Sequence, residues 1–295
     1  MLGRHILCRD ERGKFRQRGA RVTGSGRAHL GQPVSSPGGT DLRRTRICDV
    51  PVDLLTMDES VAIARELIAP GQPHQHVAIN AAKVVLAHHD PELRAAIESC
   101  ALANADGQSI VWAGRLLGRP VPERVTGIDF MLRMWEVAAQ QGYRVFLLGS
   151  KPAVVEKAAA VARSSGVDIV GVRSGYWRAE EENDVVAEVA AASPDLLFVG
   201  LPTPRKEEFL HSHLDDLKAS LAVGVGGSFD VVAGEVRRAP RWMQRWGLEW
   251  LHRMFQEPRR MFRRYFMGNF LFVGLLAREG WRTRISRRGR TSSRG

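Results

Sequence analysis

Uninterrupted apolar segments alternate with segments of helical periodicity along most of this chain, and this alternation restricts the fold more than any other feature. The apolar segments, which we expect to be strands, lie at 76–80, 101–106, 143–149, 167–173, 195–201 and 221–227. The expected helices lie at 57–67, 81–86, 108–117, 130–140, 152–163, 185–192 and 206–217. Strands that are apolar throughout, joined by helices, indicate an α/β fold whose mostly parallel sheet has helices on both faces.

Charge divides the 295-residue chain into three parts. Residues 1–46 hold eleven basic and three acidic side chains, and the last sixty residues hold sixteen arginines and three acidic side chains. Net charges of +8 and +13 at the ends, against +11 for the whole chain, leave −10 for residues 47–235. The attraction to anions is therefore local to the ends and is not a property of the α/β body.

The basic C-terminal segment is also aromatic, since the last sixty residues hold four of the seven tryptophans. Trp242, Trp246 and Trp250 repeat at helical spacing, and such a stripe could simply pack on the core. However, the segment holds too many arginines for a buried face. Arginine forks suit diphosphate, while Trp, Phe and Met suit the headgroup region of a bilayer. We therefore favour an interfacial segment.

The cysteines and the hydropathy indicate a cytoplasmic protein. Cys8, Cys48 and Cys100 have neither paired nor metal-like spacing, and no signal peptide is visible. The apolar stretch at 265–277 is shorter than the roughly 20 residues that span a bilayer. We expect a disordered basic extension at 1–45, a catalytic domain at 46–238, a helical appendage at 239–280 and a disordered basic tail at 281–295.

Glycines follow several of the predicted strands, at Gly149, Gly200, Gly226 and Gly227. Such turns let the backbone approach a ligand, and the helix N-termini that follow can hold phosphate. The alternative is that these glycines only make tight turns. Neither a dinucleotide fingerprint nor a P-loop is present, and the histidines lack metal-site spacing, so we expect no cofactor and no metal.

Asp106 is the carboxylate of most interest. It follows an apolar strand and precedes Gly107 and a helix, which places it at the carboxyl edge of the predicted sheet. A carboxylate there could accept a proton from a hydroxyl nucleophile, but Asp is also favoured as a helix N-cap. Thr126 and Asp129 match a capping box, so Asp129 is interpreted as structural.

Seven stretches together resemble the WecG/TagA/CpsF glycosyltransferase family (glycosyltransferase family 26). They are AINAAKVVLA (78–87), NADGQSIVW (104–112), RVTGIDF (124–130), VFLLGS (145–150), FVGLPTPRKEEF (198–209), VGVGGSFDVVAGEVRRAP (223–240) and GLEWLHRMFQEPRRMFRRY (247–265). The resemblance covers about 47–275, and its last two blocks are long, ordered and therefore the most specific.

The resemblance implies a Rossmann-like domain with a C-terminal helical appendage that binds the membrane. It implies an inverting, metal-independent hexosyltransferase, peripheral on the inner face of the cell membrane. Such enzymes move N-acetylmannosamine, its uronic acid or another hexose from a UDP-sugar to a polyprenyl-diphosphate-linked acceptor sugar. The pathway would be bacterial envelope or exopolysaccharide synthesis. A second copy of the chain is a further candidate partner.

The resemblance also assigns residues. Asp106 matches the proposed base, Arg124 an arginine near the donor diphosphate, and Asn80 the asparagine after the first strand. Arg253, Arg260 and Arg263 match appendage arginines that meet diphosphate. Two departures lie near the presumed sugar site: Ala78 where many members have Thr, and Arg205-Lys206-Glu207 where they have Lys-Gln-Glu. The donor sugar therefore need not be N-acetylmannosamine.

Two other classes of function remain as alternatives. One is a nucleotide- or nucleic-acid-binding α/β protein that uses its basic tails, although no nucleic-acid motif is recognisable and its aromatic residues would have no role. The other is a non-catalytic scaffold at the membrane. We expect a UDP-sugar, a polyprenyl-diphosphate-linked acceptor and an anionic membrane surface as partners, and no nucleic acid.

Overall fold

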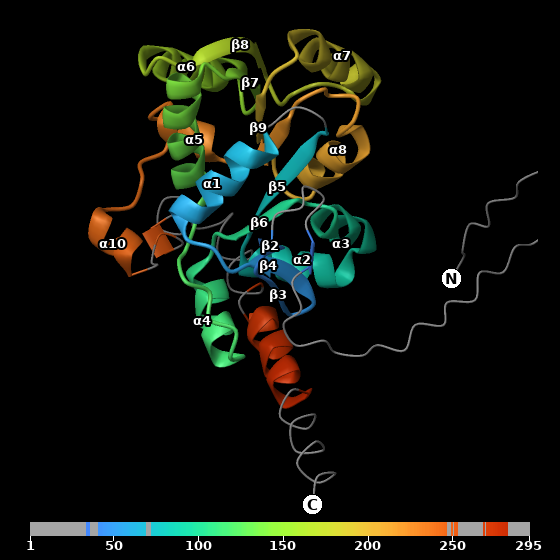
Figure 1. Ribbon diagram of the computed structural model, residues 1–295, viewed down its shortest axis with the longest axis vertical. Coiled ribbons are helices and arrows are strands. Elements are labelled where there is room, and N and C mark those ends of the chain that lie inside the picture. Colours follow the sequence, from blue (N-terminus) through green and yellow to red (C-terminus); the bar gives the residue numbers. More distant parts are fainter. Residues whose placement is uncertain are drawn as a thin grey trace, which may run out of the picture. The chain divides into compact units, whose positions relative to one another are not determined.

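A computed structural model describes residues 34–35, 41–68, 72–246, 249, 251–252, 268 and 270–282. Its centre is a six-stranded sheet with the strand order β6-β5-β10-β9-β7-β8, in which every pairing is parallel (Figure 1). The strands are β5 (His74–Ile79), β6 (Leu102–Ala105), β7 (Arg144–Gly149), β8 (Asp168–Arg173), β9 (Leu196–Gly200) and β10 (Leu221–Gly224). All six begin within two residues of their predicted positions, which confirms the α/β, Rossmann-like fold class.

Helices follow the strands, as the alternation predicts. They are α1 (Met57–Leu67), α2 (Ala81–His89), α3 (Pro91–Glu98), α4 (Gln108–Leu116), α5 (Gly127–Gln141), α6 (Pro152–Ser164), η1 (Ala179–Glu181), α7 (Glu182–Ala192), α8 (Arg205–His213), α9 (Ser228–Val232) and α10 (Arg241–Arg245). Sequence analysis missed α3, although Asp90 and Pro91 are a recognisable start: the Asp90 carboxylate accepts from two backbone N–H groups, and proline occupies the first turn.

In the central strands β7, β9 and β10, alternate side chains enter different cores. Val145 and Leu147 of β7 join the core that holds α1, α5 and α6, whereas Phe146 and Leu148 join the core that holds α7 and α8. The middle of the sheet is thus buried on both faces, which is why β7, β9 and β10 are almost entirely apolar.

Two small antiparallel pairs precede the sheet: β1 (Val34–Ser35) with β2 (Asp41–Leu42), and β3 (Arg44–Ile47) with β4 (Val50–Asp53). The predicted boundary between residues 45 and 46 falls inside β3. Arg44 donates to the buried carboxylate of Asp53 at 2.6 Å, and this carboxylate also accepts from the backbone N of Ala103 in β6 at 2.7 Å. The ion pair therefore lies within the β3–β4 hairpin, and the hydrogen bond from Ala103 to Asp53 attaches the hairpin to the edge of the sheet.

Residues 270–282 form a helix whose inner side packs on the body. Phe272 is buried in the core that also holds Val77 and Ile79 of β5, and Leu275 and Leu276 pack against the same core. The carboxylate of Glu279 accepts from the guanidinium of Arg119 at 2.6 Å. Of the helices in the described ranges, none combines the length and the apolar character needed to cross a membrane.

Candidate active site

The predicted site residues gather where the parallel strands end. β5 and β10 are neighbours, yet α2 after β5 packs into the core of the β3–β4 hairpin, while α9 after β10 packs into the core of α5 and α6. The chain thus leaves these two strands toward opposite faces of the sheet. In open α/β sheets this divergence is where ligands bind.

Asp106 lies directly after β6, half-buried, with its backbone N donating to the carbonyl of Ile79 at 2.8 Å. It does not cap α4, whose N-cap is Gly107, without any side-chain hydrogen bond. Instead its Oδ1 accepts from the backbone N of Gly127 at 3.3 Å, in the first turn of α5. The carboxylate therefore faces the positive end of a fifteen-residue helix, which favours a negative charge there.

Asn80 directly follows β5 and lies close to the strand end that carries Asp106. Its side-chain oxygen accepts from the backbone N of Lys83 at 3.0 Å and so caps α2. A Cβ on Gly107 would lie 3.3 Å from the Asn80 Cβ, so the two strand ends are in contact. The structure therefore brings Asn80 and Asp106 together and gives Asn80 a local structural role as well.

Lys206 and Glu207, at the start of α8, belong to a buried ion cluster. Glu207 Oε1 lies 2.7 Å from Lys83 Nζ and 3.1 Å from Lys206 Nζ, and Lys83 also donates to the carbonyl of Ala78 at 2.7 Å. All three side chains are at most 6 % exposed, and Glu207 Oε2 has no hydrogen-bond partner within the described part of the chain. Two buried ammoniums therefore share one carboxylate.

The charges of this cluster shift the pKa values of its members. Burial and the Lys83 ammonium lower the pKa of Lys206 to about 8, against the raising effects of Glu207 and Asp106. Burial alone would raise the pKa of Glu207, but Lys83 and Lys206 lower it to about 2. Because the Asp106 charge raises the pKa of Lys206, Asp106 interacts electrostatically with the buried cluster.

The predicted glycines lie at the ends of β7, β9 and β10. A Cβ on Gly149 would lie 2.6 Å from the backbone of Gly200, and a Cβ on Gly200 would lie 2.6 Å from the Phe229 ring. Gly226 has a φ of +55°, and Gly227 is the N-cap of α9. Packing against the Gly200 backbone and the Phe229 ring therefore requires glycine at positions 149 and 200, whether or not these turns also bind a ligand.

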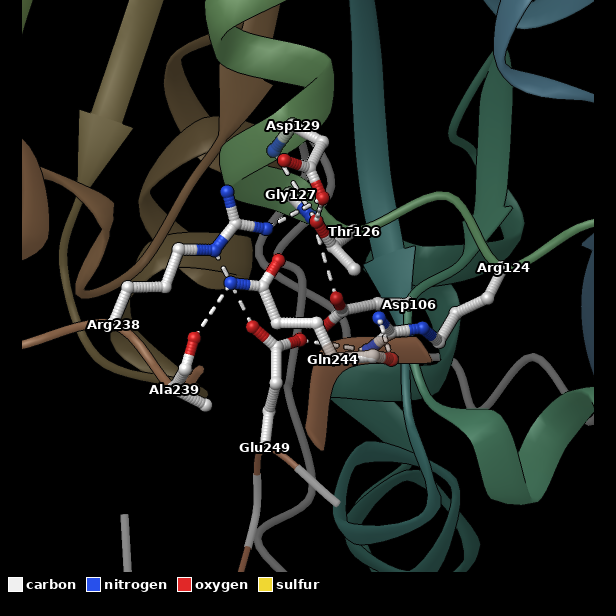
Figure 2. A network of polar contacts seen from close by, with 9 residues as sticks. All are labelled: Asp106, Arg124, Thr126, Gly127, Asp129, Arg238, Ala239, Gln244 and Glu249. Carbon is white, nitrogen blue, oxygen red and sulfur yellow. Dashed lines mark hydrogen bonds and ion pairs between the residues drawn. The ribbon is translucent and has the colours of Figure 1, made fainter. Parts of the chain in front are cut away.

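Arg124 is held in an ionic network with the C-terminal segment (Figure 2). Its guanidinium lies 2.7 Å from the Glu249 carboxylate and donates to the carbonyl of Gln244 at 3.0 Å. The other oxygen of Glu249 lies 3.4 Å from Arg238, which is also 2.7 Å from Asp129. Glu249 therefore bridges two arginines, and Arg238 joins this bridge to Asp129 at the start of α5.

Asp129 anchors this network, as its structural interpretation predicts. Thr126 Oγ1 accepts from the backbone N of Asp129 at 3.2 Å and donates to the Asp129 carboxylate at 2.6 Å. Burial would raise the pKa of Asp129, but the hydrogen bonds from Arg238 and Thr126 lower it below its usual value. Thr126 thus caps α5, while the ionised Asp129 carboxylate holds the Thr126 hydroxyl and Arg238.

Sequence analysis missed Lys83, Asp230, Arg238 and Glu249. Asp230 accepts from Ser150 Oγ at 3.2 Å, which links the turn after β7 to α9. Arg253, Arg260 and Arg263, the predicted appendage arginines, lie outside the described residues. In the ranges described, no three His, Cys, Asp or Glu side chains group as ligands for a metal ion.

The chain matches the model of a known protein family over most of its length. Residues 45–286 match the model of the glycosyl transferase WecG/TagA/CpsF family, so the match includes the sheet, Asp106, the buried ion cluster and the Glu249 bridge. It indicates glycosyl transfer in cell-envelope polymer synthesis, from a nucleotide-sugar donor to a lipid-linked acceptor. The chain belongs to the glycosyl transferase WecG/TagA/CpsF family.

Proposed function

We propose that this protein transfers a hexose from a UDP-sugar to a polyprenyl-diphosphate-linked sugar, with inversion at the anomeric carbon. The hexose would be N-acetylmannosamine, its uronic acid or another hexose, and the product would enter envelope or exopolysaccharide synthesis. The observation that supports this proposal most is Asp106, a half-buried carboxylate at the carboxyl edge of the sheet and at the N-terminus of α5. A single displacement needs one such base and no covalent nucleophile.

In the proposed reaction the acceptor hydroxyl attacks the anomeric carbon while Asp106 accepts its proton. The new C–O bond forms from the hydroxyl oxygen as the bond to the diphosphate oxygen breaks, and the electron pair leaves with UDP. The positive end of α5 favours Asp106 as a carboxylate before the reaction. Near Asp106, Asn80 and the cluster of Lys206 and Glu207 would position the donor sugar.

Leaving UDP gains negative charge, which the protein must stabilise. Arg124, the turns at Gly149, Gly200, Gly226 and Gly227, and the appendage arginines Arg253, Arg260 and Arg263 would bind the diphosphates. Arginines and backbone N–H groups can fulfil this role without a divalent ion. We therefore expect that turnover in excess chelator equals turnover in added Mg²⁺; a rate that collapses with chelator and returns with Mg²⁺ contradicts this part of the proposal.

The decisive experiment replaces Asp106 with Asn. The amide oxygen can still accept from the Gly127 N–H, so stability should be kept while the base is lost. With a panel of UDP-sugars and a short-chain polyprenyl-diphosphate-sugar acceptor, we expect UDP release to fall by at least about 100-fold. Unchanged release from a folded Asp106→Asn variant would remove Asp106 as the base, and a wild type that never releases UDP would favour the non-catalytic scaffold.

The acceptor is proposed to be reached at the membrane surface. The basic C-terminal segment carries exposed Trp242 and Trp246, and the helix at 270–282 exposes Phe270, Val273 and Trp281. Exposed aromatic residues beside arginines suit an anionic headgroup region. Binding to anionic liposomes and to duplex DNA at matched salt tests this assignment. Tight binding to DNA without binding to liposomes would instead favour the nucleic-acid alternative.

A further inference from the structure

Glu249 occupies the position of an anion between two arginines (Figure 2). One carboxylate oxygen lies 2.7 Å from Arg124 and the other 3.4 Å from Arg238. Arg124 precedes α5 and Arg238 follows α9, whereas Glu249 lies beyond α10. Both guanidiniums thus contact the Glu249 carboxylate, which is brought in from another part of the chain.

The two arginines are positioned independently of Glu249. Arg238 is held by the Asp129 carboxylate at 2.7 Å, and Asp129 is itself fixed by its hydrogen bonds with Thr126. Arg124 also donates to the carbonyl of Gln244. Because these contacts do not involve the Glu249 carboxylate, both guanidiniums keep a partner if Glu249 withdraws.

This pair of guanidiniums fits a diphosphate better than it fits a carboxylate. A carboxylate carries one negative charge, while a diphosphate carries at least two and offers oxygens to both planar forks. Gly127, whose N–H donates to Asp106 at 3.3 Å, directly follows Thr126 of this network. A diphosphate bound by the two arginines would therefore lie near the proposed base.

We infer that Arg124 and Arg238 form one diphosphate-binding site, which the Glu249 carboxylate occupies in the free protein and leaves when the diphosphate binds. This inference rests on the proposed function and adds Arg238 as a binding residue and Glu249 as an internal competitor. The diphosphate belongs either to the nucleotide donor or to the polyprenyl acceptor, and both share the chemistry that the site recognises.

The test compares Glu249→Gln with wild type by calorimetric titration, using UDP in one arm and geranyl diphosphate in the other. Removing the competing charge should tighten binding about fivefold, the order expected for one partly exposed ion pair. The matched control is Glu136→Gln, which removes the same charge from an exposed position of α5 and should change neither affinity. Tightening for UDP alone assigns the site to the donor, and tightening for geranyl diphosphate alone assigns it to the acceptor.

Arg238 is tested with a charge-keeping and a charge-removing variant. Arg238→Gln should weaken binding of the same ligand about tenfold, whereas Arg238→Lys, which can still pair with Asp129, should weaken it less. In the Arg238→Gln background the gain from Glu249→Gln should shrink, because the two residues act on one site.

The outcomes separate this inference from the proposed function. If wild type binds UDP but Glu249→Gln binds neither ligand more tightly, the inference is overturned and the proposed function stands. If wild type binds neither UDP nor geranyl diphosphate, both fail together.

Discussion

The Lys83 ammonium of α2 lies 2.7 Å from the Glu207 carboxylate of α8, and both side chains are buried. Lys206 is the second cation on the same carboxylate oxygen, at 3.1 Å. One carboxylate thus neutralises part of a buried charge of two ammoniums. Attraction between the buried charges offsets the free energy of desolvating them only while all three partners are present. The stability of the cluster therefore depends on its single anion, Glu207.

Replacing Glu207 with Gln should therefore destabilise the protein strongly. Two buried ammoniums would remain without an anion, and removal of one partner from a buried pair costs about 3–5 kcal/mol. The measurement is the free energy of unfolding from urea titration. As a control, Glu188→Gln removes one partner of the exposed pair with Arg173 and should cost less than about 1 kcal/mol. Equal costs for the two variants would show that the buried cluster does not stabilise the fold.

His76 should make the protein less stable as the pH falls below neutrality. The ring is buried in β5, stacked on Phe130, with Nε2 2.9 Å from the Asn104 side-chain oxygen. The Asn104 amide donates to Ser60, so its oxygen faces His76 and the ring is the neutral tautomer that carries its proton on Nε2. Burial, assisted by the nearby Lys83 and Lys206, lowers the pKa of His76 to about 3.

The direction of this pH dependence follows from the pKa of His76 in the unfolded and in the folded state. The ordinary value of 6.5 applies to the unfolded chain, which therefore binds a proton before the folded state does. Stability from the neutral ring is complete above pH 6.5 and is lost as the pH falls toward 3, at up to about 1.4 kcal/mol per pH unit. Glu207 does not add to this slope above pH 5, because its ordinary pKa is 4.5.

Urea titrations at pH 7 and pH 5 should thus differ by about 2 kcal/mol in wild type and by much less in His76→Gln. His211→Gln, at an exposed ring on α8, is the control and should keep the wild-type difference. If His76→Gln retains the full difference between the two pH values, another group is responsible for it.

Local sequence patterns predicted the parts of the fold that depend on local periodicity. The six strands and the Thr126 cap of α5 follow from residues within one element or one turn, although the second bond of the predicted capping box, from the Thr126 backbone N to Asp129, is not formed. The position of Asp106 at the sheet edge was also predicted, but not its contact with Gly127, because that contact joins two separate segments. The alternative, that Asp106 caps α4, is not realised: the carboxylate accepts from the first turn of α5 instead.

Interactions between distant segments could not be predicted from periodicity. Lys83 lies in an apolar helical stretch, and nothing local indicates that its partner is Glu207. The first two residues of β3 were assigned to a disordered extension because residues 1–45 are rich in Arg, Gly and Ser, yet Arg44 pairs with buried Asp53. Similarly, the role of Glu249 depends on two arginines that only the fold brings together.

Gly200→Ala should affect both stability and nucleotide binding. Its Cβ would lie 2.6 Å from the Phe229 ring and 3.1 Å from the carbonyl oxygen of Gly226, so the turn after β10 must shift. Overpacking of this kind costs about 1–3 kcal/mol, and we expect weaker UDP binding in calorimetric titration. Gly274→Ala is the contrasting change: nothing lies within 4 Å of its Cβ, and alanine in that helix should stabilise by up to about 1 kcal/mol. A Gly200→Ala variant with wild-type stability and UDP affinity would contradict the proposed importance of this packing.

The aromatic residues of the C-terminal segment should contribute to membrane binding separately from its arginines. Deleting residues from about 240 onward would not test this cleanly, because buried Phe272 belongs to the core of the body. A double variant, Trp246→Ser with Trp281→Ser, removes two side chains that are 73 % and 70 % exposed and leaves that core intact. We expect at least about tenfold weaker binding to anionic liposomes in a co-sedimentation assay, since each ring buries apolar surface at the headgroups. Tyr176→Ser, which removes an aromatic side chain of equal exposure from the α/β body, should bind as wild type does.

Raising the salt concentration should weaken the liposome binding of wild type and of the double variant by a similar factor. Both proteins keep the arginines, and salt screens only the charge attraction. Wild-type affinity in the double variant would show that the arginines suffice and that these two rings have another role.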